Sequence, residues 1–113
     1  MGRESRRMPR RTVVGLVSVV DTMSEEPIGH IANLSAGGML LIANRSMAED
    51  ALYQLRFHLP ESDGLEFEVG AHVLWSDGAS APGQSWVGLR FLGLDPDTVR
   101  RLREWCQAGA QEH

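Results

Sequence analysis

The sequence predicts an all-β domain that ends in a single helix. Several segments alternate apolar and polar residues with a period of two, turn residues separate them at short spacing, and helical periodicity occurs only near the end of the chain. Six strands without intervening helices favour antiparallel pairing, closed into a small barrel or a sandwich. The length of 113 residues is enough for one modest hydrophobic core.

The first half of the chain contains three predicted strands. Residues 12–20 (TVVGLVSVV) are β-branched and apolar at both parities, which predicts a strand buried on both faces. A polar turn follows. The extended segments 27–35 and 37–43 come next with glycines at their junction, which predicts a hairpin.

Residues 51–59 and 65–75 show the period-two alternation most clearly. In both segments the odd-numbered residues are apolar, and the turn PESDG at 60–64 joins them. This parity places Trp75 in the core.

The sixth predicted strand lies within SWVGLRFLGL, residues 85–94, after a small polar loop at 77–84. Trp86 and Arg90 share its outward face. An ordinary cross-strand pair is favoured there over an outward stack or a contact with a partner.

A terminal helix is predicted over residues 95–109. Asp95 is suited to the N-cap and Pro96 to the first helical position, and the helix ends near a glycine. Its apolar face, expected to lie on the sheet, comprises Val99, Leu102 and Cys106, with Trp105 at the edge.

The composition excludes several classes of protein. No apolar run reaches the roughly 18–20 residues of a membrane span, and no secretory signal is recognisable, so a cytoplasmic location is expected. Cys106 is the single cysteine and the four histidines share no ligand spacing, which argues against a disulfide or a metal site. The sequence contains no catalytic constellation, and we expect no enzymatic activity and no cofactor.

The charges are segregated along the chain. Residues 1–11 carry five arginines against one glutamate, whereas the formal net charge of the whole chain is −4, and there is no lysine. A short basic arm on an acidic body indicates an anionic partner that is gripped locally. Longer nucleic acids are disfavoured, because the body repels their repeated phosphates.

The arm contains two overlapping arginine pairs, Arg6 with Arg10 and Arg7 with Arg11. A guanidinium can stack on a nucleobase, bind the O6/N7 edge of guanine and clamp a phosphate. Either pair could close on one ligand from two sides. The alternative is that the run is a solvated, disordered tail, as terminal basic segments often are.

A second motif, NLSAGGM, covers residues 33–39. Asn33 and Ser35 are two residues apart and project to the same side of an extended chain, while Gly37 and Gly38 allow a bound group to approach the backbone. The motif is also compatible with an ordinary hairpin turn, in which Asn and Ser bond to their own backbone.

Together, the two motifs resemble the signature of the PilZ domain, a bacterial receptor module for cyclic di-GMP (c-di-GMP). The resemblance rests on Arg-x-x-x-Arg before the first strand and Asn-x-Ser-x-x-Gly some twenty residues later. The matching residues are Arg6, Arg10, Asn33, Ser35 and Gly38. A proline directly before the second arginine favours Arg6 and Arg10 over the pair one residue later. WVGLRFLGLD resembles the last strand of the family, so the resemblance spans nearly the whole chain.

The resemblance implies a six-stranded antiparallel β-barrel capped by a helix. We accordingly expect a flexible basic arm over 1–11, a barrel with its C-terminal helix over 12–109, and a tail at 110–113. The arm's arginines would bind guanines and phosphates, and the second motif would contact a guanine from the barrel surface. The expected ligand-binding residues are Arg6, Arg7, Arg10, Arg11, Asn33, Ser35, Gly37 and Gly38.

The expected function is that of a c-di-GMP receptor and adaptor. Binding would order the arm and change the surface shown to an effector protein, which the sequence does not identify. One alternative is a PilZ-like adaptor that binds protein and no nucleotide. Another is a small barrel for single-stranded nucleic acid, which would need more exposed aromatic residues than the sequence offers.

Overall fold

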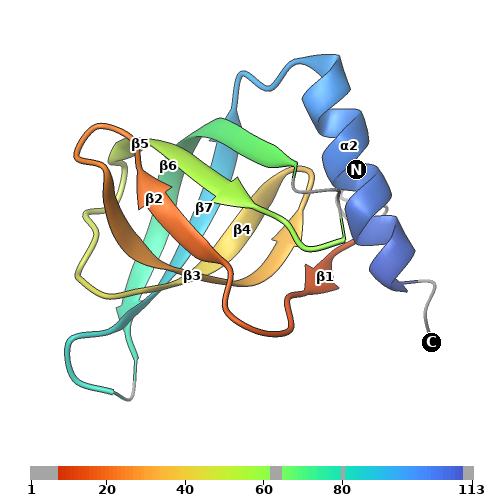
Figure 1. The fold of residues 1–113 in the computed structure, drawn as a ribbon. Helices are drawn as coiled ribbons and strands as arrows, with labels where there is room; N and C mark the ends of the chain where they lie inside the picture. Colours follow the sequence, from red (N-terminus) through yellow and green to blue (C-terminus); the bar gives the residue numbers. More distant parts are fainter. Residues whose placement is uncertain (1–7, 62–64, 80, 111–113) are drawn as a thin grey trace, which may run out of the picture.

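The structure, a computed structural model, describes residues 8–61, 65–79 and 81–110. It is a closed barrel of antiparallel strands with one short extra strand and a C-terminal helix, α2 (Figure 1). The elements are β1 (Arg11–Thr12), β2 (Ser18–Asp21), β3 (Glu26–Ser35), β4 (Gly38–Ala43), β5 (Leu52–His58), β6 (Glu66–Gly78), β7 (Ser85–Leu92) and α2 (Pro96–Ala110).

Six strands close the barrel in the order β3, β2, β5, β6, β7 and β4, and β4 returns to pair with β3. Every pairing is antiparallel. Closure leaves no free sheet edge among these six strands, which is one way in which β-proteins avoid edge-to-edge association. The predicted fold class is confirmed, with a barrel rather than a sandwich.

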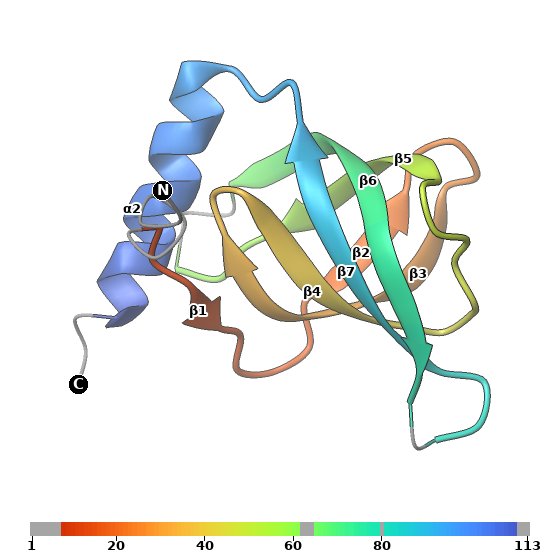
Figure 2. The same ribbon diagram turned by 180° about the vertical axis from the view of Figure 1, so that it is seen from behind.

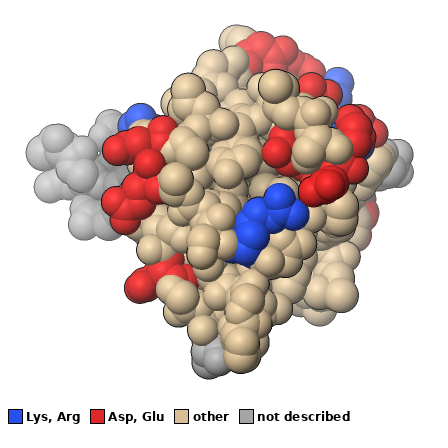
Figure 3. Space-filling view, turned by 90° about the vertical axis from the view of Figure 1, so that its left-hand side faces the viewer, with Lys and Arg blue, Asp and Glu red and all other residues tan. Residues whose placement is uncertain are grey.

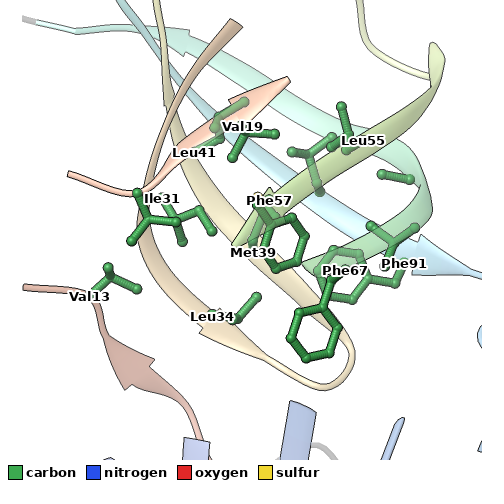
Figure 4. Packing of buried hydrophobic residues seen from close by; sticks show 14 of the residues in the cluster. Val13, Val19, Ile31, Leu34, Met39, Leu41, Leu55, Phe57, Phe67 and Phe91 are labelled. Atoms are coloured by element: carbon green, nitrogen blue, oxygen red, sulfur yellow. The ribbon is translucent and has the colours of Figure 1, made fainter. Parts of the chain in front are cut away.

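The interior is filled by side chains from alternate positions of each strand. Leu55 pairs with Val69 and Phe57 with Phe67 across β5 and β6, and all four side chains are buried. The two phenylalanine rings stack at 5.6 Å between centroids. Figure 4 shows Leu55, Phe57 and Phe67 among the side chains that point into the barrel. The predicted alternation in β5 and β6 is therefore confirmed.

Residues 12–20 do not form the continuous strand that their composition predicts. β1 and β2 both pair with the same side of β3, and the chain leaves that side between them. The Val13 amide donates to the Ala32 carbonyl, and the Ile31 amide donates to the Val17 carbonyl. The chain is therefore bonded to β3 on both sides of the excursion. The side chains at its tip are Val14, 90% exposed, and Leu16, 82% exposed, on either side of a glycine with positive φ.

The prediction that Trp75 is a core residue is also wrong, because β6 contains a bulge between Val73 and Trp75. A bulge inserts one residue and reverses the parity of the residues that follow it. Trp75 is therefore 44% exposed on the outer surface. Its indole covers Gly88 of β7, where a β-carbon would lie 2.2 Å from Trp75 Nε1.

Helix α2 begins at Pro96, and Asp95 caps it by accepting a 3.1 Å hydrogen bond from the Thr98 amide. Hydrogen bonds from Thr98 hold the pKa of Asp95 below its usual range. The helix lies against one end of the barrel, close to β1 and β3 (Figure 2). Leu102 and Cys106 face the barrel and are fully buried, as predicted.

Two hydrogen bonds fix α2 to the barrel. Trp105 Nε1 donates to the Pro60 carbonyl at 2.7 Å, and Cys106 Sγ donates to the Leu34 carbonyl at 3.1 Å. The second bond connects the helix directly to the strand that carries Asn33 and Ser35. In the part of the chain that the structure describes, no helix is long and apolar enough to cross a membrane.

Candidate functional site: the β3–β4 hairpin and the basic segment

The Asn-x-Ser-x-x-Gly motif forms the end of the β3–β4 hairpin, where Ser35 pairs with Gly38. Ser35 Oγ accepts a 3.1 Å hydrogen bond from the Gly37 amide and donates a 3.4 Å bond to the Gly38 carbonyl. The Gly37 carbonyl accepts a bond from the Phe91 amide of β7. The motif therefore makes the turn that its residue types favour, and this turn holds Ser35 in a fixed position.

The backbone of β7 lies very close to Gly38 of β4. A β-carbon on Gly38 would lie 2.1 Å from the Leu89 carbonyl oxygen and 3.3 Å from the Arg90 Cα. A contact of 2.1 Å with backbone cannot be relieved by a rotamer change. Glycine is thus required for the fold here, whatever it does for a ligand.

Gly38→Ala is expected to destabilise the protein by about 1–3 kcal/mol, the usual cost of forcing extra atoms into a packed site. The measurement is urea unfolding followed by circular dichroism. Gly78→Ala is the matched control, because nothing lies within 4 Å of a β-carbon there. Equal stability of the two variants would contradict the predicted collision.

Arg10 reaches the hairpin from the segment before β1. Its Nη1 donates to Asn33 Oδ1, and its Nη2 donates to Ser35 Oγ at 3.3 Å. The short strand β1 positions Arg10, because it pairs with β3 in the register Arg11 with Leu34 and Thr12 with Asn33. The two motifs, more than twenty residues apart in the sequence, are thus in direct contact.

Arg11, which directly follows Arg10, turns toward α2. Its Nη1 donates to the Trp105 carbonyl at 3.0 Å, and its Nη2 lies 2.5 Å from Glu61 Oε1. The guanidinium lies 3.9 Å from the centroid of the Trp105 ring, and the side chain crosses Gly109 so closely that a β-carbon there would overlap it. These contacts hold the helix on the barrel, and they turn Arg11 away from Asn33 and Ser35.

The last residues of the predicted arm belong to the folded domain. Met8 is half-buried against the core, and its Sδ lies 3.2 Å from where a β-carbon on Gly37 would be. Arg10 and Arg11 make the contacts given above. Arg6 and Arg7 lie outside the described residues, so their predicted role in binding stays a prediction.

Two hollows of about 430 Å³ are lined by described residues. One lies between the excursion after β1 and β5, and the other lies beside the start of α2. Neither is lined by Asn33 or Ser35.

The charge around the body of the molecule is mainly acidic. Seen from the side away from α2, acidic side chains gather around a largely uncharged surface, and basic side chains are few (Figure 3). Among the described residues, the Arg10 guanidinium donates only to the neutral groups of Asn33 and Ser35 and pairs with no carboxylate. Its positive charge is therefore available to an anion.

Cys106 is expected to be inert toward thiol reagents in the folded protein. Burial raises the pKa of its thiol to about 11 from an ordinary 9.0, although Arg10 and Arg11 act in the opposite direction. Only the thiolate reacts, and the Sγ atom has no access to solvent. A disulfide reagent at pH 8 should modify it only after denaturant is added, and rapid modification of the native protein would contradict this prediction.

Folding also links Cys106 to pH. Its pKa is higher in the folded than in the unfolded chain, so the neutral thiol contributes stability below about pH 9, and this contribution declines as the pH rises toward 11. Among the described residues, no group of three or more His, Cys, Asp or Glu side chains could hold a metal ion.

Two residues of the outer surface, Trp75 and Arg90, are not among the predicted site residues. The parity of its strand predicts Trp75 in the core, and only knowledge of the β6 bulge would place it on the surface. Arg90 was correctly placed on the outward face of β7, where it is exposed. Its register opposite Gly38 could not be predicted from the sequence, because strand pairing depends on distant parts of the chain.

Comparison with known proteins identifies a sequence family and solved structures with a similar fold. Residues 3–108 match the sequence profile of the PilZ domain. The Bacillus subtilis inhibitor of motility (MotI/DgrA) has a TM-score of 0.78 at 18% identity, covering 96% of this chain and 52% of that one. The PilZ domain with c-di-GMP of YcgR from Escherichia coli has a TM-score of 0.71 at 16% identity, covering 95% and 92%.

The K. pneumonia MrkH–c-di-GMP complex has a TM-score of 0.75 at 19% identity and covers 95% of this chain and 53% of that one. This chain therefore spans about half the length of the inhibitor of motility and of MrkH. At these identities the likeness shows the fold. No match was found among curated proteins. Since the profile extends over nearly the whole chain, the protein belongs to the PilZ domain family.

Proposed function

We propose that this PilZ domain is a receptor for c-di-GMP. The observation that carries the proposal is the direct contact of Arg10 with Asn33 and Ser35, which assembles both halves of the family's binding signature at one surface. The solved complexes of YcgR and MrkH with c-di-GMP share the fold of this chain and support the choice of ligand.

The arrangement suits a dianion with two guanine bases. In the free protein the Arg10 guanidinium donates to two neutral oxygens, which are weaker acceptors than a phosphate. Phosphate binding can replace these bonds with stronger ones and release Asn33 and Ser35 to bond to a guanine. The residues proposed to bind are Arg6, Arg10, Asn33, Ser35, Gly37 and Gly38, with Arg7 as the alternative to Arg6.

The folded segment before β1 lowers the entropic cost of binding. Fixing the backbone of one residue costs on the order of 1–2 kcal/mol. For Met8 to Arg11 this cost is already met by contacts with the barrel and α2, so it does not reduce the affinity for the ligand. The predicted ordering of the arm thus falls on residues before Met8, which lie outside the described residues.

As an adaptor, the domain would pass the signal to an effector protein in the cytoplasm. The segment around Arg10 supports this part of the proposal. Arg10 lies at the proposed ligand site, and the next residue, Arg11, contacts α2. A ligand that moves Arg10 changes the position of a segment that holds the helix. The surface near α2 would then differ between the free and bound states.

Isothermal titration calorimetry with c-di-GMP tests the proposal. GMP and a single-stranded oligonucleotide of similar charge are the controls. Saturable binding of c-di-GMP with weak or no binding of both controls supports a receptor. Absence of c-di-GMP binding would leave the nucleotide-free adaptor as the function, and preferred binding of the oligonucleotide would favour a nucleic-acid-binding barrel.

A further inference from the structure

Most arginines in the described part of the chain are neutralised by carboxylates. The ion pairs are Arg11 with Glu61, Arg45 with Glu26, Arg56 with Glu25, Arg100 with Asp97 and Glu104, and Arg101 with Asp97. Within residues 8–61, 65–79 and 81–110, no carboxylate pairs with Arg10, Arg90 or Arg103. Two of these three lie beside the β3–β4 hairpin.

Arg90 lies across Gly38 from Ser35. Ser35 pairs with Gly38 of β4, and Gly38 pairs with Arg90 of β7, so the three residues form one row across the sheet. Neighbouring strands are about 4.8 Å apart, which places Ser35 and Arg90 about 10 Å apart along this row. Gly38 has no side chain, so no side chain stands between Ser35 and Arg90 in this row.

The Arg90 side chain points outward and is free to bind. Its neighbours Leu89 and Phe91 are buried in the barrel, so Arg90 occupies the opposite face of β7 and is exposed. Its guanidinium has no hydrogen bond to any described residue. Its cross-strand neighbour His72 bonds through Nε2 to Asp50 at 3.0 Å and not to Arg90.

Arg10 and Arg90 therefore flank the hairpin end from opposite sides. Arg10 approaches from the β1 side of β3, and Arg90 stands one strand beyond Gly38. In a protein whose formal net charge is −4, two unneutralised guanidiniums around one glycine turn favour an anion with more than one charge. A cyclic dinucleotide has two phosphates, one for each guanidinium.

We propose that Arg90 is a further ligand-binding residue, which binds a phosphate of c-di-GMP from the side of the hairpin opposite Arg10. The inference rests on the proposed function and extends the site onto β7. A guanidinium and a phosphate form charge-assisted hydrogen bonds, which are about twice as strong as neutral ones. Lysine also binds phosphate, as a point charge, so the contact does not depend on the forked shape of arginine.

The test is calorimetric titration of c-di-GMP into Arg90→Gln, Arg90→Lys and Arg103→Gln. Arg90→Gln should bind about tenfold more weakly than the wild type, and Arg90→Lys should recover most of that loss. Arg103→Gln removes the same charge from the exposed side of α2, and its affinity should stay within twofold of the wild type. Thermal unfolding by circular dichroism should be unchanged in all three, because both arginines are exposed.

The possible results distinguish failure of the Arg90 contact from failure of the proposed receptor function. If the wild type binds and Arg90→Gln binds equally well, Arg90 is not a contact, although the receptor function stands. An equal loss in Arg103→Gln would show a general effect of charge and would overturn the assignment. Arg90→Lys binding as weakly as Arg90→Gln would overturn the phosphate contact. If the wild type does not bind, both proposals fail.

Discussion

Arg10→Ala is expected to weaken c-di-GMP binding at least tenfold while leaving thermal unfolding close to that of the wild type. A hydrogen bond to a charged group contributes roughly 1.5–3 kcal/mol, and each 1.4 kcal/mol corresponds to a factor of about ten in affinity. The side chain is exposed, and within the described residues it bonds only to Asn33 and Ser35. Ser35 keeps its bond from the Gly37 amide without it. The loss should therefore appear in binding and not in folding.

Calorimetry gives the affinity, and circular dichroism during heating gives the stability. Arg103→Ala is the matched control, since Arg103 is an exposed arginine on α2 without an ion pair among the described residues. Arg6→Ala should also lose at least tenfold, and Arg7→Ala should lose less if the first pair binds the ligand. Wild-type affinity in both Arg6→Ala and Arg10→Ala would refute the arginine clamp.

The elements that could be predicted from the sequence are those governed by local periodicity. In β5 and β6 one residue in two is buried, because one face of each strand contacts the core, and the alternation from Leu55 to Val73 follows this. Helix α2 is bounded by its own capping residues, so its start at Pro96 lies within one residue of the predicted start. Neither prediction requires knowledge of another part of the chain.

Both errors arise where one strand contains more residues than its partner. The excursion around Val14 and Leu16 interrupts the pairing of residues 12–20 with β3, and the bulge before Trp75 reverses the parity in β6. A run that is apolar at both parities looks the same whether it is buried on both sides or leaves the sheet. The difference lies in the register with another strand, which a single sequence does not contain.

The site was predictable to the extent that its two sequence motifs resemble those of a known family. The resemblance of the two motifs implied that Arg10 acts together with Asn33 and Ser35, and the structure places these three side chains in contact. The spacing could not predict that the side chains of Arg10 and Arg11 make different contacts, because this depends on where α2 packs. Arg10 and Arg11 are consecutive, and their side chains point in opposite directions, Arg10 toward the hairpin and Arg11 toward Trp105.

Arg11→Ala is expected to produce the opposite result to Arg10→Ala, with a loss of stability of about 2–3 kcal/mol and little change in the affinity of the folded protein for c-di-GMP. The Arg11 side chain is only 13% exposed, and its guanidinium donates to the Trp105 carbonyl and lies over the Trp105 ring. A charged hydrogen bond of roughly 1.5–3 kcal/mol and a cation–π contact of about 0.5–2 kcal/mol are lost together, partly offset by the relaxation of α2.

For a domain of this size such a loss lowers the midpoint of thermal unfolding by roughly 10 °C. Arg45→Ala is the matched control, because Arg45 also pairs with a glutamate, at 3.7 Å, but is exposed and makes no cation–π contact within the described residues. Exposed pairs contribute about 0–1 kcal/mol. Binding should be measured well below the lowered midpoint, so that unfolding does not imitate a weaker site. If Arg11→Ala keeps its stability and loses affinity tenfold, then Arg11 leaves α2 to join the ligand, and the pair Arg7 with Arg11 replaces Arg6 with Arg10 as the clamp.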